Sequence, residues 1–313
     1  MMVPPPSPTA QAVFVVGVSR SGTTLMRHIL ERSSQVSVCR ESHYLGHLIA
    51  GEGVRQQVRR RFGDQRDDAT ARRIVDFLYD GGLHRASRLR EASRQWTWTR
   101  RHVPRERFEQ RFLASDRSER ALFDVVLRTY AEHEGKPIVG EKTPAHVRYV
   151  ATLLEWYPEG RIVHMVRDPR AIYVSEIRRR RGETSPALPY RLLRHMPFAL
   201  KAFVLLETTV AWLESILRLE RNLARYPGRY LAVSFEALVA HPEDEVRRLC
   251  AFLGVPFEAP MLEQVVVSRG HALGSVGFDR AAATRWRDRI GFFVDRWFRA
   301  WFGRRMRRLG YDG

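Results

Sequence analysis

Short apolar runs alternate with longer stretches of helical spacing along most of this chain. The runs cover residues 12–17, 36–39, 137–140, 161–166 and 229–234, and a helical pattern follows each of them. Strands that are buried on both faces of a parallel sheet read as continuous apolar runs, and helices connect them to their parallel neighbours. The pattern therefore predicts an α/β fold with a central parallel sheet.

Several of the expected helices have recognisable ends. Thr143 and Asp168 each precede a proline, so a capping side chain stands before a residue suited to the first helical position. Pro242 opens a further helix in the same way, and Gly254 closes it. Another helix is marked by a stripe of apolar residues at helical spacing: Leu205, Trp212, Ile216, Leu219 and Leu223.

The organisation of the chain is simple. With 313 residues, of which 44% are hydrophobic, it is long enough to bury a large core, and we expect residues 11–313 to form a single domain. Residues 1–10 are proline-rich and are predicted to be a disordered tail. Residues 46–120 are rich in arginine, carry Trp96 and Trp98 and show no clear strand, so we predict a mostly helical insertion there.

The sequence contains few features that indicate the cellular compartment. The N-terminus has no charged region of the kind that begins a signal peptide, and no apolar run approaches the roughly 20 residues needed to cross a bilayer. Cys39 and Cys250 provide neither a disulfide framework nor a zinc spacing. We expect a cytoplasmic protein, either fully soluble or peripheral at the inner membrane surface.

The net charge of +18 comes almost entirely from arginine. Such a charge favours polyanionic partners: nucleotides, nucleic acid or anionic lipid. The alternative is a solvated arginine surface without a specific partner. Nucleic acid is the least favoured partner, because the chain has no zinc-finger spacing, RNP-type motif or helix-turn-helix signature.

The most informative stretch follows the first apolar run. Gly17 and Gly22 have the spacing of the nucleotide-binding P-loop, but Thr23 stands where that motif has its lysine, and a basic residue, Arg20, comes earlier. Backbone N–H groups and the start of the next helix can still receive a phosphate. The loop therefore predicts a cradle for an anionic nucleotide other than ATP or GTP. His28, one turn into that helix, is interpreted as a packing residue.

Three polar segments should meet at the carboxyl edge of the sheet, where open α/β sheets bind ligands. They are 19–24, 140–144 and 167–170. The planar guanidinium of Arg167 suits a phosphate, and Ser175 lies two turns into the helix that Asp168 would cap. We interpret Asp168 as a helix cap rather than a magnesium ligand or catalyst, because an arginine precedes it and a proline follows it.

With these residues in place, the chain resembles a bacterial sulfotransferase that uses 3′-phosphoadenosine 5′-phosphosulfate (PAPS), of the family related to tyrosylprotein sulfotransferases. The matching segments are 18–26, 140–144, 166–170 with Ser175, 285–286 and 309–312. The resemblance implies a P-loop-like three-layer α/β sandwich. It places the 5′-phosphosulfate on Arg20, Ser21, Gly22, Thr23 and Thr24, and the 3′-phosphate on Arg167 and Ser175. Arg285 stands where the tyrosylprotein enzymes have a lysine near the cofactor.

Sulfuryl transfer needs a base for the acceptor hydroxyl and positive charge at the leaving oxygen. Glu41 is our candidate base, since a glutamate follows the matching strand in the tyrosylprotein family, and we expect strand 36–39 to neighbour the P-loop strand. The alternatives are an ion pair of Glu41 with Arg40, or His43 as the base.

Lys142 would stabilise the bridging oxygen of the leaving group, helped by Arg20. The alternative for Lys142 is a surface ion pair with Glu141. We expect no metal, because fixed cations suffice for a sulfuryl group. Residues 46–120 lie outside the resemblance, so the acceptor stays open among carbohydrate, lipid, phenol and tyrosyl peptide.

An aromatic helix is predicted over 285–308. One face carries Trp286, Ile290, Phe293, Trp297 and Trp301, with Val294 and Phe298 beside it, and arginines cover the rest. This helix either packs on the sheet or lies on a membrane surface. Trp286 either anchors the helix or stacks near the adenine.

Two other functions remain as alternatives. A P-loop kinase or NTPase would have to work without the lysine at position 23. A non-catalytic polyanion-binding protein would keep the cradle only as a scaffold.

Overall fold

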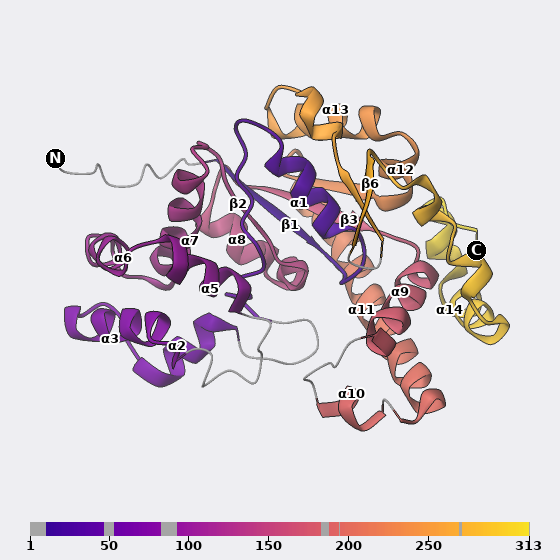
Figure 1. Ribbon diagram of the computed structural model, residues 1–313, viewed down its shortest axis with the longest axis horizontal. Helices are drawn as coiled ribbons and strands as arrows, with labels where there is room; N and C mark the ends of the chain where they lie inside the picture. The colour runs from indigo at the N-terminus through magenta and orange to yellow at the C-terminus, as the bar shows by residue number, and fades with distance from the viewer. Residues whose placement is uncertain are drawn as a thin grey trace.

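The computed structural model describes residues 11–46, 53–82, 93–182, 188–193, 195–268 and 271–312. At its centre lies a parallel sheet with the strand order β2-β1-β3-β4 (Figure 1). The strands are β1 (Ala12–Gly17), β2 (Val139–Lys142), β3 (Arg161–Val166) and β4 (Tyr230–Ser234). The predicted α/β fold with a central parallel sheet is therefore confirmed.

Helices cover both faces of this sheet. Those that follow the strands are α1 (Thr23–Glu31), η1 (Pro144–Tyr149), α8 (Val150–Trp156), α9 (Pro169–Gly182), α10 (Leu188–Leu193), α11 (Pro197–Arg225), α12 (Phe235–Ala240) and α13 (Pro242–Leu253). The C-terminal part adds η2 (Ala259–Leu262), the antiparallel pair β5 (Val265–Ser268) and β6 (His271–Val276), η3 (Arg280–Ala283), η4 (Arg287–Arg289) and α14 (Phe292–Arg308). None of the described helices is long and apolar enough to cross a bilayer.

Two separate cores give the sandwich its three layers. Along β1, Val13 and Val15 belong to the core shared with α1, α12 and α13, whereas Phe14 and Val16 belong to the core on the opposite face. Successive side chains of a strand point to opposite faces, so one apolar run supplies both cores. The predicted three-layer arrangement follows directly from this alternation.

Two strand predictions need correction. Segment 36–39 makes only isolated parallel bridges, Val36 with Ile138 and Cys39 with Glu141, so it neighbours β2 and not the P-loop strand β1 as we expected. The predicted strand 137–140 is displaced to Val139–Lys142. Pro137 cannot donate to the sheet, and the charged residues at the other end of β2 disguised its continuation.

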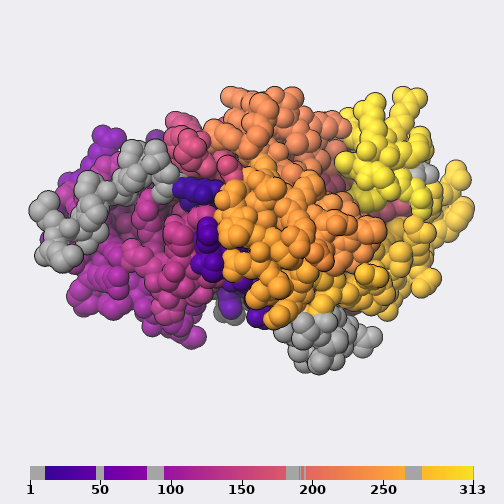
Figure 2. All heavy atoms as spheres, turned by 90° about the horizontal axis from the view of Figure 1, so that it is seen from above, coloured from indigo at the N-terminus to yellow at the C-terminus, as the bar shows by residue number. Residues whose placement is uncertain are grey.

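Helices fill the predicted insertion. They are α2 (Val54–Phe62), α3 (Asp68–Tyr79), α5 (Ser93–His102) and α6 (Arg105–Leu113), with α7 (Glu119–His133) leading back to the sheet, and the part of 46–120 that the structure describes contains no strand. Figure 2 shows these helices at one end of the molecule and the C-terminal residues at the other. The predicted tail, 1–10, lies outside the described residues.

The C-terminal helix is shorter than predicted and buries a different face. It begins at Phe292, while Trp286 and Ile290 flank the separate turn η4. Phe298, Phe302 and Met306 are buried against the core. Phe293 and Trp301, which we placed on the apolar face, are 85% and 66% exposed. The helix therefore packs on the body of the protein and still leaves aromatic side chains in solvent.

Candidate anion-binding and transfer site

The loop between β1 and α1 is shaped by two glycines with positive φ. A Cβ on Gly17, at φ 147°, would lie 2.6 Å from the carbonyl oxygen of Met165, and one on Gly22, at φ 100°, would lie 2.6 Å from the ring of Phe235. Gly22 precedes α1, whose first turn has neither a side-chain cap nor an acidic residue. The free N–H groups and the helix dipole at this end can therefore receive an anion.

The side chains of the loop divide into two groups. Ser21 is buried and its Oγ donates to the carbonyl oxygen of Val18 at 2.7 Å, so this hydroxyl closes the loop. Thr23 is also buried, whereas Thr24 is exposed on the first turn of α1. Of these three hydroxyl groups, that of Thr24 is the one on an exposed residue, so it can join the backbone N–H groups in contacting an anion.

Arg20 lies on the side of α9. It adopts φ 69°, an uncommon conformation for a residue with a side chain, and its Nε donates to Ser175 Oγ at 3.0 Å. The structure thus brings together two of the predicted cofactor residues. It also directs Arg20 toward Ser175, the residue assigned to the 3′-phosphate, although we had placed its charge beside Lys142.

Arg167 is held at the edge of the same loop. Its Nη1 donates to the carbonyl oxygen of Arg20 at 3.0 Å, and its Nη2 to that of Ala282 at 2.9 Å. Its Nε is buried, and no residue in the described part of the chain accepts a hydrogen bond from it. Burial lowers the pKa of Arg167 to about 10, so the group stays charged at neutral pH. An unpartnered donor on a buried cation is costly, and an anion would satisfy it.

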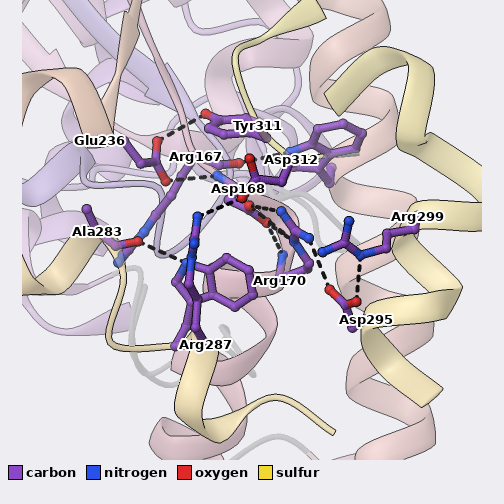
Figure 3. Close-up of polar contacts among 12 residues, drawn as sticks. Arg167, Asp168, Arg170, Glu236, Ala283, Arg287, Asp295, Arg299, Tyr311 and Asp312 are labelled. Carbon is purple, nitrogen blue, oxygen red and sulfur yellow. Dashed lines mark hydrogen bonds and ion pairs between the residues drawn. The ribbon is translucent and has the colours of Figure 1, made fainter. Parts of the chain in front are cut away.

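Asp168 caps α9 and forms an ion pair with Arg170 (Figure 3). Its Oδ1 accepts from the backbone N–H of Arg170 at 2.8 Å, and its Oδ2 from Arg170 Nη2 at 2.7 Å. Arg170 also reaches Asp295 of α14 at 3.0 Å and lies 4.6 Å from the ring of Trp286. Trp286 is buried, as an anchor would be. No group of three or more metal-ligating side chains occurs among the described residues.

The remaining matched residues of the C-terminal part lie around this cluster. Arg285 makes two 2.9 Å contacts through Nη2 with the carboxylate of Asp279. Tyr311 donates to Glu236 at 3.1 Å, and Glu236 also accepts from the backbone N–H of Asp168 (Figure 3). The end of the chain is thereby fastened beside Arg167, while Arg285 is committed to an ion pair.

On the other side of β1, Lys142 and Glu41 form an ion pair. Lys142 is nearly buried, with 7% of its side chain exposed, while Glu41 has 36% exposed. Glu41 also lies 3.1 Å from His43 Nε2. The alternatives in which Glu41 pairs with Arg40, or Lys142 with Glu141, are wrong, since Lys142 and Glu41 pair with each other.

The electrostatics of Glu41 keep it ionised. Burial alone would raise its pKa, but the hydrogen bond from His43 and the charge of Lys142 outweigh burial and hold the pKa below the ordinary range. His43 is the more enclosed group, with 10% of its side chain exposed and Nδ1 buried. Of the two candidate bases, Glu41 is the one that solvent reaches.

Glu141 is a site residue that sequence reasoning missed. Its Oε1 accepts from Ser42 N at 3.1 Å and from Thr143 Oγ1 at 2.6 Å, and Ser42 Oγ donates to the same oxygen. Its Oε2 lies 2.7 Å from His146 Nδ1. The carboxylate thus fastens the loop that carries Glu41 to the strand that carries Lys142. The only available signal was a charged residue directly after the predicted strand 137–140.

The insertion also holds this loop. Trp96 of α5 donates through Nε1 to the carbonyl oxygen of Ser42 at 3.1 Å, and Gln95 accepts from the backbone N–H of Arg40 at 3.1 Å.

His28, which we interpreted as packing, is exposed on α1 near this side of the site. Partial burial and the charges of Arg27 and Lys142 lower its pKa to about 4, so it is neutral at pH 7.

This combination defines a class: an α/β protein with a P-loop-like anion cradle that lacks the NTPase lysine. The model of the sulfotransferase family matches residues 12–259, and the chain belongs to that family. The family predicted from the sequence, and the sulfotransferase class of enzyme with it, are confirmed.

The curated relatives include sulfotransferases of animals and of a mycobacterium. Protein-tyrosine sulfotransferase A of Caenorhabditis elegans is 23% identical over 82% of this chain and 54% of its own length. Protein-tyrosine sulfotransferase 1 of Danio rerio is 21% identical over 96% of this chain and 72% of its own. The omega-hydroxy-beta-dihydromenaquinone-9 sulfotransferase of Mycobacterium tuberculosis is 29% identical over 44% of this chain and 33% of its own. The chain thus spans only part of these relatives.

Solved structures agree on the fold. The sulfotransferase domain of the Synechococcus PCC 7002 olefin synthase has a TM-score of 0.55 at 20% identity, covering 92% of this chain and 91% of its own. The sulfotransferase domain of the curacin biosynthetic pathway has a TM-score of 0.53 at 18% identity, covering 97% and 98%. At this level of identity the likeness concerns the fold alone.

Proposed function

We propose that this protein transfers a sulfuryl group from PAPS to a hydroxyl group of an acceptor. The observation that carries the proposal is the uncapped start of α1 with two cations beside it, Arg20 bonded to Ser175 and Arg167 with its unpartnered Nε. Such a site suits a nucleotide with two separate anionic groups. Membership of the sulfotransferase family supports PAPS as that nucleotide.

The proposed division of labour follows the two sides of the loop. Backbone N–H groups of Gly22, Thr23 and Thr24, with the Thr24 hydroxyl, hold the 5′-phosphosulfate. Arg167, Ser175 and Arg20 hold the 3′-phosphate. Arg285 would have to leave Asp279 to reach the cofactor, so we assign it no direct contact.

Glu41 and Lys142 carry the chemistry in this proposal. Glu41 accepts the proton of the acceptor hydroxyl while the hydroxyl oxygen forms a bond to sulfur. The bond between sulfur and the phosphate oxygen of the donor breaks, and Lys142 stabilises the negative charge left on that oxygen. Because Lys142 and Glu41 form an ion pair, the cation proposed for the leaving oxygen and the base proposed for the acceptor lie side by side.

We also propose that the protein acts in the cytoplasm, where thiols stay reduced. Both cysteines, Cys39 and Cys250, are buried and free, which is compatible with that compartment.

Calorimetric binding without added metal tests the cofactor. We expect 3′-phosphoadenosine 5′-phosphate to bind more tightly than 5′-AMP or ATP, and Arg167→Ala to abolish that preference. Arg248→Ala is the matched control, because Arg248 also donates to a backbone carbonyl but lies on α13. Equal binding of the three nucleotides would refute the 3′-phosphate site.

Turnover with PAPS labelled in the sulfuryl group tests the reaction. A tyrosyl peptide, a phenol, a carbohydrate and a lipid alcohol should be tried as acceptors. Glu41→Gln should abolish transfer to whichever acceptor works and leave binding of 3′-phosphoadenosine 5′-phosphate intact. Magnesium-dependent ATP turnover would instead favour the kinase or NTPase alternative, and heparin or nucleic-acid binding without transfer would favour the scaffold alternative.

A further inference from the structure

Exposed apolar side chains gather in one region of the molecule. Among the side chains that the structure describes, every large apolar one that is exposed lies between residues 192 and 223 or between 292 and 301. The most exposed are Phe293 at 85%, Phe198 at 84% and Phe292 at 71%. Scattered exposed apolar residues are ordinary, but most of these lie on two helices, α11 and α14, and a concentration of this kind marks an interaction surface.

The C-terminal helix α14 has two different faces. Phe298, Phe302 and Met306 point into the core. Phe293, Trp297 and Trp301 follow one another at four-residue spacing and form a second stripe on the outer side, where Trp297 is half-buried and the other two are exposed. Arg304 and Arg308 fall on this same outer stripe, three and seven residues after Trp301.

Helix α11 continues this surface. Trp297 Nε1 donates to Thr209 Oγ1 at 3.1 Å, which fixes the outer stripe of α14 beside the middle of α11. The neighbours of Thr209 on α11 include Leu206 and Val210, which are 56% and 62% exposed. Figure 1 shows α11 and α14 running along the same side of the molecule. We call the five residues Phe293, Trp297, Trp301, Leu206 and Val210 the aromatic face.

Positive charge without a paired carboxylate lies along the outer side of α14. The one acidic residue of α14, Asp295, is paired with Arg170 and Arg299. In the described part of the chain, no carboxylate lies within ion-pair distance of Arg304 or Arg308, and Lys201 is exposed next to Phe198. A second copy of the chain would bring the same arginines face to face, so this charge disfavours a dimer.

We propose that the aromatic face, with Arg304 and Arg308, is a docking surface for an anionic lipid bilayer. Tryptophan and phenylalanine insert at the level of the headgroups, and arginines on the same helix bind anionic headgroups. Because no described helix could span a bilayer, the contact would be peripheral. The surface is independent of the transfer chemistry, since none of its residues belongs to the proposed site.

Co-flotation of the full chain with vesicles tests this surface. We expect it to float with phosphatidylcholine vesicles that contain phosphatidylglycerol and to stay behind with phosphatidylcholine alone. An arginine near an anionic surface contributes about fivefold to the partition coefficient, so Arg304→Gln with Arg308→Gln should lower it about 30-fold. Phe293→Ser with Trp301→Ser should abolish flotation, because it removes aromatic side chains that would insert. Both residues are exposed, so the fold should tolerate the change.

The matched control is Arg59→Gln with Arg66→Gln, which removes the same charge from exposed positions in the insertion and should leave flotation unchanged. Circular dichroism and binding of 3′-phosphoadenosine 5′-phosphate confirm that each variant is folded. The proposal is overturned if the wild-type protein ignores anionic vesicles, or if the two arginine pairs have equal effects. It is also overturned if light scattering shows a dimer that Phe293→Ser with Trp301→Ser dissociates, because a second copy would then cover the aromatic face.

Discussion

The carboxylate of Glu141 lies 2.7 Å from Nδ1 of His146, and only 1% of either side chain is exposed. The other oxygen of Glu141 accepts hydrogen bonds from Ser42 and Thr143. Through this one carboxylate, the loop of Glu41 is fastened to the end of β2 and to the turn that follows. We therefore regard Glu141 as a positioning residue for both Glu41 and Lys142.

Glu141→Gln should lower turnover far more than cofactor affinity. A glutamine has only one accepting oxygen, so it cannot accept from Ser42 and Thr143 and also from His146 as the carboxylate does. The loop that carries Glu41 should therefore shift, while the anion cradle at α1 is unchanged. A buried hydrogen-bonded group of this kind is worth about 1–3 kcal/mol of stability. Urea unfolding, calorimetry with 3′-phosphoadenosine 5′-phosphate and turnover separate these effects.

Glu31→Gln is the matched control for that experiment. Like Glu141, Glu31 accepts two side-chain hydrogen bonds, here from Arg27 and Tyr130, but it lies at the far end of α1. It should cost stability and spare turnover. Equal losses of turnover in both variants would show that Glu141 acts only through stability.

The pH dependence of turnover should identify the base. The contacts with His43 and Lys142 hold the pKa of Glu41 below its ordinary range in spite of burial, so Glu41 can accept a proton throughout pH 5–8. The acid limb of kcat/KM should then lie below about pH 4.3, the usual pKa of glutamate. An acid limb at higher pH that disappears in His43→Asn would transfer the role to His43.

Ser175→Ala should weaken the 3′-phosphate site. It removes a hydroxyl from the proposed ligands and frees the guanidinium of Arg20. A hydrogen bond to a charged group is worth about 1.5–3 kcal/mol, so affinity for 3′-phosphoadenosine 5′-phosphate should fall about tenfold or more, while affinity for 5′-AMP stays constant. Ser33→Ala, at the opposite end of α1, should change neither value. A parallel loss for both nucleotides would speak against a 3′-phosphate role.

Arg170→Met should be the most destabilising of these changes. Arg170 is 1% exposed and joins Asp168 of the α9 cap to Asp295 of α14 (Figure 3). Removing one partner of a buried ion pair costs about 3–5 kcal/mol, because the other charge stays buried. Asp295→Asn, at a side chain that is 25% exposed, should cost about 1 kcal/mol or less.

Denaturant unfolding with hydrogen exchange over α9 and α14 measures both effects. In Asp295→Asn, exchange should quicken in α14 alone, whereas Arg170→Met should loosen the start of α9 as well. Equal unfolding free energies for the two variants would mean that Arg170 does not join the two helices as we describe.

Features that depend on neighbours in sequence were predictable. Strand Arg161–Val166 and the start of α1 at Thr23 lie where the apolar runs and the glycine loop placed them. Asp168 caps α9, as the proline beside it indicated. The same prediction was wrong for Thr143, whose side chain makes no capping bond and donates to Glu141. Because β1 pairs with β3 from Val13 to Gly17, the loops after these strands come to one edge of the sheet. Alternating burial, caps and loop geometry are local, so the sequence by itself determined the fold class and the position of the anion cradle.

Features that depend on partners far apart in sequence were decided only by the tertiary structure. Segment 36–39 could pair with β1 or with β2, and it pairs with β2. The order of strands follows from how the helices cover the sheet. Residues 99 and 155 positions apart form the Ser42–Glu141 and Arg20–Ser175 contacts, which no local pattern encodes. In α14 both faces carry aromatic residues, so composition could not say which one is buried. Only packing against α11 and Arg170 selects Phe298 and leaves Phe293 in solvent, because burial is a property of the assembled core.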